Sequence, residues 1–212
     1  MKRLTFFTLC IVLFLGCTQD KTVTVIKLGH GLDVSHSVHK GMLYMSDVLE
    51  EKSGGTMRID VYPSEQLGTE RQCLELLQIG SMGMTKVSAA VLENFAPSTK
   101  VLTLPYIFRD TEHAYEVLDG PIGQELLVQS EKYWLRGLGY FDSGWRSFYT
   151  KDTKVQVPED LEGMKIRVQE SQTAMNMVRL LGGSPTPISF GELYTALQQG
   201  IVDGAENNLP SF

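Results

Sequence analysis

Arg167 lies on the polar side of a short predicted strand. Met164, Ile166 and Val168 alternate as one apolar face, which places Lys165 and Arg167 on the opposite face. That opposite face meets either solvent or a cleft, and an exposed Arg on the wet side of a sheet is the simpler interpretation. A cleft that binds anions is the alternative, because an Arg guanidinium fits a carboxylate through two parallel hydrogen bonds.

Three more polar residues would complete such a cleft with Arg167. They are Arg146, which precedes it in the chain, and Asn207 and Asn208, which follow a later Asp-Gly pair. The chain has a formal net charge of -6, so a local Arg would have to supply the attraction for an anion. Spacing alone does not show that these residues converge, and solvent exposure stays open beside the cleft.

A metal site is a second possible chemistry, because Asp33, His36 and His39 follow one another at three-residue spacing. Three ligands on one helical face could hold zinc if a fourth group came from elsewhere. The chain offers no second group at a recognisable spacing, and helix N-termini attract such residues anyway. We therefore predict no metal and no cofactor.

Acid-base catalysis by Asp203 and Glu206 is a third possibility. Their spacing allows a pair, but carboxylates that follow a helix more often cap it or form a turn. The sequence also contains no Gly-x-Ser-x-Gly elbow and no glycine-rich phosphate loop. The prediction is that the protein is not an enzyme.

Composition indicates an ordinary globular protein. Of the 212 residues, 42% are hydrophobic, 9% aromatic and 21% charged. The acidic balance argues against a nucleic-acid partner. Cys10 and Cys17 belong to the N-terminal leader described next, so Cys73 alone remains in the folded part and no internal disulfide is expected.

The N-terminus is typical of an exported protein. Lys2 and Arg3 precede an apolar run from Leu4 to Leu15, which predicts a signal peptide over residues 1–16. The residues before Cys17 resemble a bacterial lipoprotein signal, so Cys17 is the predicted lipidation site and residues 17–22 a tether. An ordinary secretory signal is the alternative. The expected location is the periplasm, with membrane contact only through the lipid.

Strands and helices alternate along most of the chain, which predicts an α/β fold of two lobes. We expect strands at 23–28, 57–61 and 84–90, two strands within 138–149, and one around Arg167. We expect helices at 37–52, 69–79, 111–118, after Pro121, at 171–181 and at 189–199. Thr69 with Gln72 and Ser189 with Glu192 read as capping boxes. Lobe I is assigned to residues 23–140 and lobe II to residues 141–212.

Four stretches carry a resemblance to a known family. They are "DLEGMKIRV" from Asp160, "LGGSPTPISFGELYTALQQGIVDGAENN" from Leu181, "VYPSEQLGTER" from Val61 and "LTLPYIF" from Leu102. From about Val23 onward the chain resembles the solute-binding proteins of tripartite ATP-independent periplasmic (TRAP) transporters, the DctP-type family. This resemblance implies a two-lobed periplasmic binding fold with a ligand cleft between the lobes.

The resemblance also implies roles for single residues. Arg167 would grip the carboxylate of an organic acid, with help from Arg146 and Asn207. Phe190 matches an aromatic position at the cleft wall, and His30 and Glu70 match positions that sense the remote polar end of the ligand.

The ligand class follows from one departure and one similarity. Sialic-acid binders of the family carry a Glu and an Arg at the positions of Ser88 and Val91, so sialic acid is not expected. Other stretches resemble the branch that binds glucuronate and galacturonate. The hydroxyls of such sugar acids would suit His30, Glu70, Lys86 and Asn208, with Ser88 on the same strand face as Lys86.

The resemblance implies a monomer that captures the acid and delivers it to TRAP membrane permease subunits driven by an ion gradient. A C4-dicarboxylate is the alternative ligand, and a ligand-sensing lipoprotein of a signalling system is the alternative role. Family members are usually longer, so we also expect the chain to be truncated at its C-terminus, with lobe II incomplete.

Overall fold

The computed structural model describes residues 22–211. The predicted signal peptide at 1–16, the lipidation site Cys17 and all but the last residue of the predicted tether lie outside the described residues. Within residues 22–211, every helix is too short or too polar to cross a membrane.

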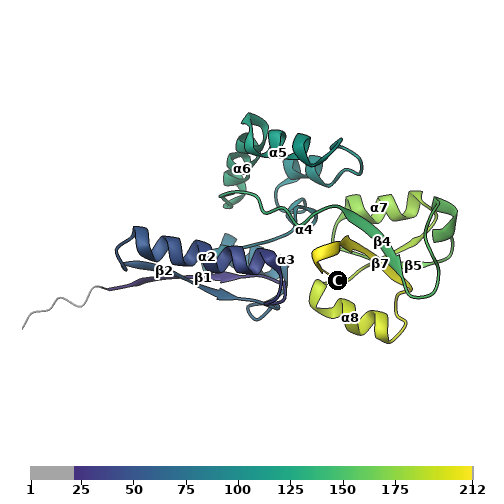
Figure 1. Cartoon of the computed structure of the whole chain (residues 1–212), viewed down its shortest axis with the longest axis horizontal. Helices are drawn as coiled ribbons and strands as arrows, with labels where there is room; N and C mark the ends of the chain where they lie inside the picture. The colour runs from purple at the N-terminus through teal and green to yellow at the C-terminus, as the bar shows by residue number, and fades with distance from the viewer. Residues whose placement is uncertain (1–21, 212) are drawn as a thin grey trace, which may run out of the picture.

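Lobe I is built on a parallel sheet in the order β2-β1-β3 (Figure 1). Its strands are β1 (Thr24–Gly29), β2 (Met57–Tyr62) and β3 (Met84–Thr85). The crossovers contain α2 (Ser37–Lys52) and α3 (Glu70–Gln78). Leu28, Val38, Met42 and Ile59 form the buried core between sheet and helix.

Lobe II is built on a sheet in the order β4-β7-β5-β6, in which only β4 is antiparallel to its neighbour. Its elements are β4 (Arg146–Thr150), β5 (Lys165–Val168), α7 (Gln172–Leu180), β6 (Ser184–Pro187), α8 (Phe190–Gln198) and β7 (Gly204–Asn208). Ile166, Val168 and Val178 are fully buried in its core. The predicted alternation of strands and helices is confirmed in both lobes.

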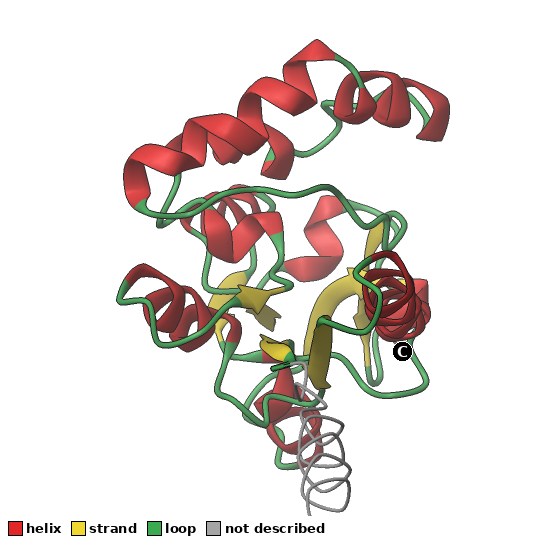
Figure 2. Cartoon of the chain, turned by 90° about the vertical axis from the view of Figure 1, so that its left-hand side faces the viewer, coloured by secondary structure: helices red, strands yellow, loops and turns green. Residues whose placement is uncertain are grey.

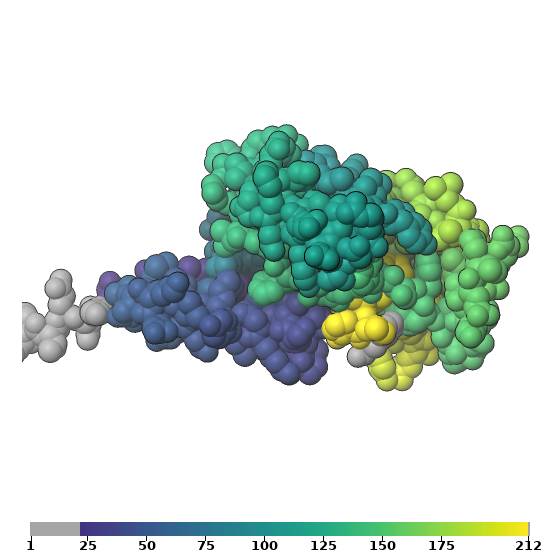
Figure 3. Space-filling model, turned by 45° about the horizontal axis from the view of Figure 1, so that its top comes forward, coloured from purple at the N-terminus to yellow at the C-terminus, as the bar shows by residue number. Residues whose placement is uncertain are grey.

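A helical layer connects the two sheets and lies over one side of them (Figures 1 and 2). It consists of α4 (Ala89–Leu92), α5 (Thr111–Asp119) and α6 (Pro121–Gln129) with short 3₁₀ segments at Pro97–Thr103 and Ser130–Tyr133. Further 3₁₀ turns occupy Pro158–Leu161 and Leu209–Ser211. In the space-filling view the two lobes lie side by side and adjoin, with this layer across them (Figure 3). The boundary at residue 140 stays a prediction.

Two strand predictions are wrong. The strand expected at 84–90 stops at Thr85, because its only partner, β1, ends at Gly29 and offers no further backbone groups. Residues 89–92 form α4 instead. Of the two strands expected within 138–149 only β4 forms, because residues 138–145 run between the lobes without a neighbouring strand.

The two predicted capping boxes have different outcomes. Thr69 caps α3, and its partner Gln72 returns a side-chain bond to the backbone of Thr69. The prediction of a capping box at Ser189 is wrong. Ser189 makes no capping bond to α8, and its hydroxyl donates instead to the Glu192 carboxylate at 3.2 Å.

Candidate ligand site between the lobes

Arg167 is held at the centre of the lobe II sheet with its side chain toward lobe I. β5 lies between β6 and β7, so Arg167 pairs with Thr186 on one side and Ala205 on the other. The residue is only 1% exposed. Burial lowers the pKa of Arg167 and the nearby Glu206 carboxylate opposes that effect. Arg keeps its proton in such surroundings, so β5 presents a buried positive charge.

The Arg167 guanidinium is only partly engaged by the protein. Its Nε donates to the carbonyl of Ile188 at 2.9 Å, and its Cζ lies 6.0 Å from the centre of the Phe190 ring. Within residues 22–211 no group accepts a hydrogen bond from its two terminal nitrogens. Those nitrogens form the fork that binds a carboxylate through two bonds.

A narrow pocket at Arg167 is lined by both lobes. Lobe II contributes Arg167, residues of the two loops after β5 and β6, and Phe190 at the start of α8. Lobe I and α4 contribute the following lining residues: Glu65, Thr69, Glu70, Arg71 and Val91. Of the predicted site residues, the structure brings Arg167, Phe190 and Glu70 together here.

Arg146 is occupied by lobe II itself. Its Nε contacts the Glu206 carboxylate, one terminal nitrogen donates to Asn207 Oδ1 at 3.1 Å, and the other donates to the Glu206 carbonyl at 2.8 Å. Asn207 Oδ1 also accepts the backbone N–H of Asn208 at 3.0 Å. This network fixes the side chains on β7. A contact between Arg146 or Asn207 and a ligand stays a prediction.

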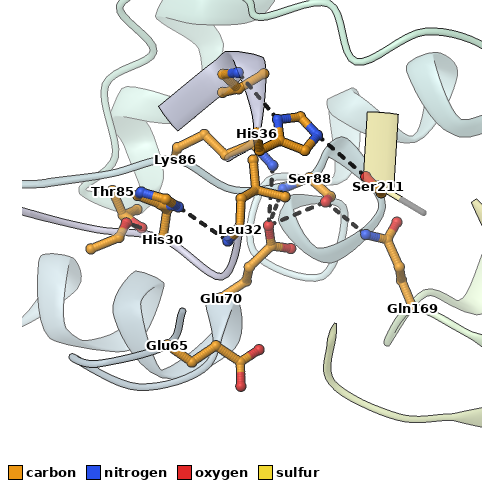
Figure 4. Close-up of polar contacts among 12 residues, drawn as sticks. His30, Leu32, His36, Glu65, Glu70, Thr85, Lys86, Ser88, Gln169 and Ser211 are labelled. Atoms are coloured by element: carbon orange, nitrogen blue, oxygen red, sulfur yellow. Dashed lines mark hydrogen bonds and ion pairs between the residues drawn. The ribbon is translucent and has the colours of Figure 1, made fainter. Parts of the chain in front are cut away.

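Asn208 takes part in a contact between the lobes. Its Oδ1 accepts from the Ser211 hydroxyl at 2.5 Å, and Ser211 Oγ lies 3.4 Å from Nε2 of His36 at the start of α2 (Figure 4). His36 also caps α2, because its Nδ1 accepts the backbone N–H of Val38. The end of β7 is therefore tied to lobe I away from Arg167.

Glu70 organises the lobe I wall of the pocket (Figure 4). Its Oε1 lies 3.4 Å from Lys86 Nζ and accepts from the Ser88 backbone N–H at 3.1 Å and from the Ser88 hydroxyl at 3.2 Å. Gln169 of lobe II donates to the same hydroxyl at 2.6 Å. Ser88 does not share a strand face with Lys86, since β3 has already ended. The Glu70 carboxylate brings the two together instead.

His30 follows β1 directly, as predicted, but it is engaged inside lobe I. Its Nδ1 accepts the backbone N–H of Leu32 at 3.1 Å, so the neutral ring carries its proton on Nε2, which lies 3.0 Å from His39 Nδ1. Burial, with added repulsion from His39 and Lys86, lowers the pKa of His30 to about 4. In the described part of the chain no three His, Cys, Asp or Glu side chains could hold a metal ion together.

Sequence reasoning missed Glu65 and Gln169, which both bridge the lobes. Glu65 Oε1 accepts the backbone N–H of Gly191 at 3.1 Å, 126 residues away. The "PSEQLG" stretch contains Glu65, but its position depends on left-handed φ angles of 52° at Ser64 and 59° at Glu65. A local pattern of residue types does not reveal such a conformation in non-glycine residues.

The sequence matches one protein family over residues 28–212: bacterial extracellular solute-binding protein, family 7, or DctP. The chain belongs to this family. DctP is a family of solute-binding proteins of TRAP transport, and it is not an enzyme family.

Solved structures of family members share the fold. A TRAP solute-binding protein of Anaerococcus prevotii with bound D-glucuronate is 44% identical, with a TM-score of 0.84 over 87% of this chain and 60% of its own. One from a Bradyrhizobium species in complex with D-galacturonate is 43% identical, with a TM-score of 0.85 over 88% and 62%. One from Sulfurospirillum deleyianum with bound succinate is 32% identical, with a TM-score of 0.85 over 89% and 61%. The predicted two-lobed α/β fold is confirmed.

The chain is shorter than the related proteins that it matches. It spans 57% and 54% of the lengths of the first two curated relatives, which are 42% and 36% identical to it.

Proposed function

We propose that this DctP protein captures a carboxylated sugar acid, similar to glucuronate or galacturonate, outside the cytoplasm and delivers it to an ion-gradient-driven TRAP permease. The observation that carries the proposal is Arg167, a fully buried cation whose terminal nitrogens have no acceptor within the described part of the chain. A buried charge is costly unless it is paired, so a partner from outside the chain would relieve that cost. A ligand carboxylate has the right charge and shape for this role.

The rest of the ligand would meet the lobe I wall. Glu70, Lys86 and Ser88 combine acceptors with donors within one connected network, which suits hydroxyl groups because a hydroxyl both donates and accepts. His30 is buried behind this wall. Asn208 is buried where it accepts the hydrogen bond from Ser211. We assign them a role in positioning the wall, and Arg146 with Asn207 a role in fixing the approach to Arg167.

Capture would follow from closure of the lobes on the ligand. The pocket at Arg167 has walls from both lobes, so a ligand contacts both only when they are closed. A ligand that binds the closed state better shifts the population toward it. This is hinge closure of two domains around a ligand.

A C4-dicarboxylate is the second candidate, since a related structure holds succinate. Succinate would use Arg167 in the same way but has no hydroxyl for the lobe I wall. The two candidates therefore predict different dependence on Glu70.

Calorimetric titration with glucuronate, galacturonate and succinate tests the proposal, with Arg167→Lys as the variant. Lys keeps the charge but loses the planar fork, so we expect at least a tenfold loss of affinity, about 1.4 kcal/mol. Arg179→Lys is the matched control, because Arg179 belongs to the same lobe and its side chain donates to Asn176 on the exposed surface of α7. Equal affinity of Arg167→Lys and the wild type would refute the clamp, and binding of none of the three acids would refute the ligand class.

A further inference from the structure

We propose that Glu65 is a latch between the lobes, which caps helix α8 of lobe II from lobe I and stabilises the closed state through that contact. This inference rests on the proposed function for its role in capture. The contact itself belongs to the protein and can be tested without any ligand.

The N-terminus of α8 receives from Glu65 the cap that its own sequence does not supply. The first N–H groups of a helix have no partner inside the helix. Ser189 stands at the capping position but makes no capping bond. The N–H of Gly191 donates instead to Glu65 Oε1 at 3.1 Å, and a carboxylate at this end of a helix also interacts favourably with the helix dipole.

The loop around Glu65 is shaped to reach across. Ser64 and Glu65 both adopt left-handed backbone conformations, with φ of 52° and 59°. Two backbone bonds hold them there: Ser64 N–H donates to the carbonyl of Leu32, and Glu65 N–H donates to the carbonyl of His30, each at 3.0 Å. Left-handed backbone is unfavourable for residues other than glycine, so the surrounding structure must impose it. Its result is to place Glu65 in the lining of the pocket at Arg167.

Gly191 is the complementary feature on lobe II. A Cβ atom at this position would lie 2.4 Å from Glu65 Oε2, well inside any real contact distance. Glycine thus allows the carboxylate to approach the helix end. A side chain at position 191 would force the Glu65 carboxylate away from this end of the helix.

Placing the charged carboxylate of Glu65 at the end of α8 costs free energy, because the site is partly buried. Burial raises the pKa of Glu65, the Gly191 bond opposes the rise, Glu70 and Glu192 add to it, and Arg167 lowers it again. These are the charged groups that face the carboxylate. Its protonation at acidic pH removes the charge from the cap, so the latch weakens as the pH falls.

The first test compares Glu65→Asn with Glu192→Asn. Asn tolerates the left-handed backbone at position 65 but is too short to reach Gly191. Glu192 stands at the same helix end, and within residues 22–211 its carboxylate accepts a bond from Ser189 of its own lobe, so its replacement removes an equal charge without breaking a described contact between lobes. We expect Glu65→Asn to weaken uronate binding about three- to tenfold, as for a half-exposed charged hydrogen bond, and Glu192→Asn to change it less than about twofold.

A double-mutant cycle with Gly191→Ala adds the geometric test. The Ala methyl group collides with the Glu65 carboxylate, so Gly191→Ala should weaken binding more in the wild type than in Glu65→Asn. The latch would be overturned if the effects of Glu65→Asn and Gly191→Ala on affinity were additive, or if Glu65→Asn and Glu192→Asn bound the acid equally well. Binding of the acid by the wild type would still support the proposed function in either case.

A ligand-free measurement separates the two proposals. In ¹⁵N-labelled protein, the Gly191 amide shift should follow the titration of a carboxyl group in the wild type and in Glu192→Asn, and lose that titration in Glu65→Asn. If no acid binds, the proposed function fails and this titration alone decides the latch. Its absence in the wild type, with and without the acids, would overturn the latch.

Discussion

Two fully buried charges lie between the lobes, and they differ in how many hydrogen bonds the chain supplies to them. Glu93, directly after α4, is 0% exposed, and Arg167 on β5 is 1% exposed. Glu93 accepts from the Ser171 hydroxyl at 2.8 Å, from the Thr173 backbone N–H at 3.0 Å and from the Thr103 hydroxyl at 2.7 Å. Arg167 donates one hydrogen bond within the described residues, to a backbone carbonyl.

The surroundings of Glu93 favour its charged form. Burial by itself raises its pKa, but the bonds from Thr173, Thr103 and Ser171 outweigh that effect and the pKa is lowered. Ser171 and Thr173 belong to the N-terminus of α7, so the carboxylate fastens that helix to the segment after β3. A buried charge whose bonds are all supplied by the chain is part of the fold, whereas one with free donors is held ready for a partner.

Replacing Arg167 with Met should separate binding from stability most strongly. We expect carboxylate binding to weaken by about 3 to 5 kcal/mol, since a buried charged bond to the ligand is lost. The melting temperature should stay equal or rise, because Arg167 forms no direct ion pair within residues 22–211 and the nearby Glu206 keeps its pair with Arg146 when an apolar side chain of similar length replaces Arg167. Calorimetry and thermal unfolding measure the two effects. A melting temperature several degrees lower would mean that Arg167 holds the fold as Glu93 does.

Replacing Glu93 with Ala should give the reverse result. Three donors lose their acceptor, and one of them, Ser171, is fully buried, so the free energy of unfolding should fall by about 3 to 4 kcal/mol. Chemical denaturation measures this loss. Glu159→Ala, in an exposed turn, is the control that should change stability little. Unchanged stability of Glu93→Ala would refute the contrast between the two charges.

His30 adds a third buried titratable group, which is satisfied only when neutral. Its pKa falls from 6.5 in the unfolded chain to about 4 in the fold, so the unfolded state binds more protons between these values. Its contribution, on the order of 3 kcal/mol, should be present above pH 6.5 and be lost as the pH falls toward 4. His36 changes in the same direction. Chemical denaturation at several pH values measures this contribution. The free energy of unfolding should change less with pH in His30→Asn than in the wild type, and His113→Asn on the distant α5 should leave the wild-type pH dependence unchanged.

Replacing Glu70 with Gln should have the smallest effect, and one that depends on the ligand. We expect uronate binding to weaken by about 1 kcal/mol, because the hydroxyl-facing wall loses its charged acceptor and the order of Lys86 and Ser88. Succinate binding should change little. The ratio of the two dissociation constants measures this selectivity, and an equal loss for both ligands would contradict the separate roles of the two walls.

Local patterns predicted most of the helices and strands and the apolar side of β5. The alternation around Arg167 placed it opposite the apolar face of β5, and Ile166 and Val168 are indeed in the core. The Thr69 box, with both partners inside four residues, formed as predicted. These predictions hold because each depends on residues close together in the chain. The family motifs in the sequence also predicted the two-lobed arrangement.

Tertiary structure decided whatever needed a distant partner. The strand at 84–90 ended because β1 ended, and the box at Ser189 failed while Glu65 of the other lobe capped α8. Arg146 proved to be engaged by Glu206, and Glu65 came to the cleft through an unusual backbone conformation. A sequence pattern states that a face is polar. Whether that face meets water, a neighbouring strand or the opposite lobe depends on distant chain segments, 60 residues away for Arg146 and Glu206 and 126 for Glu65 and Gly191, since only folding brings them within hydrogen-bonding distance.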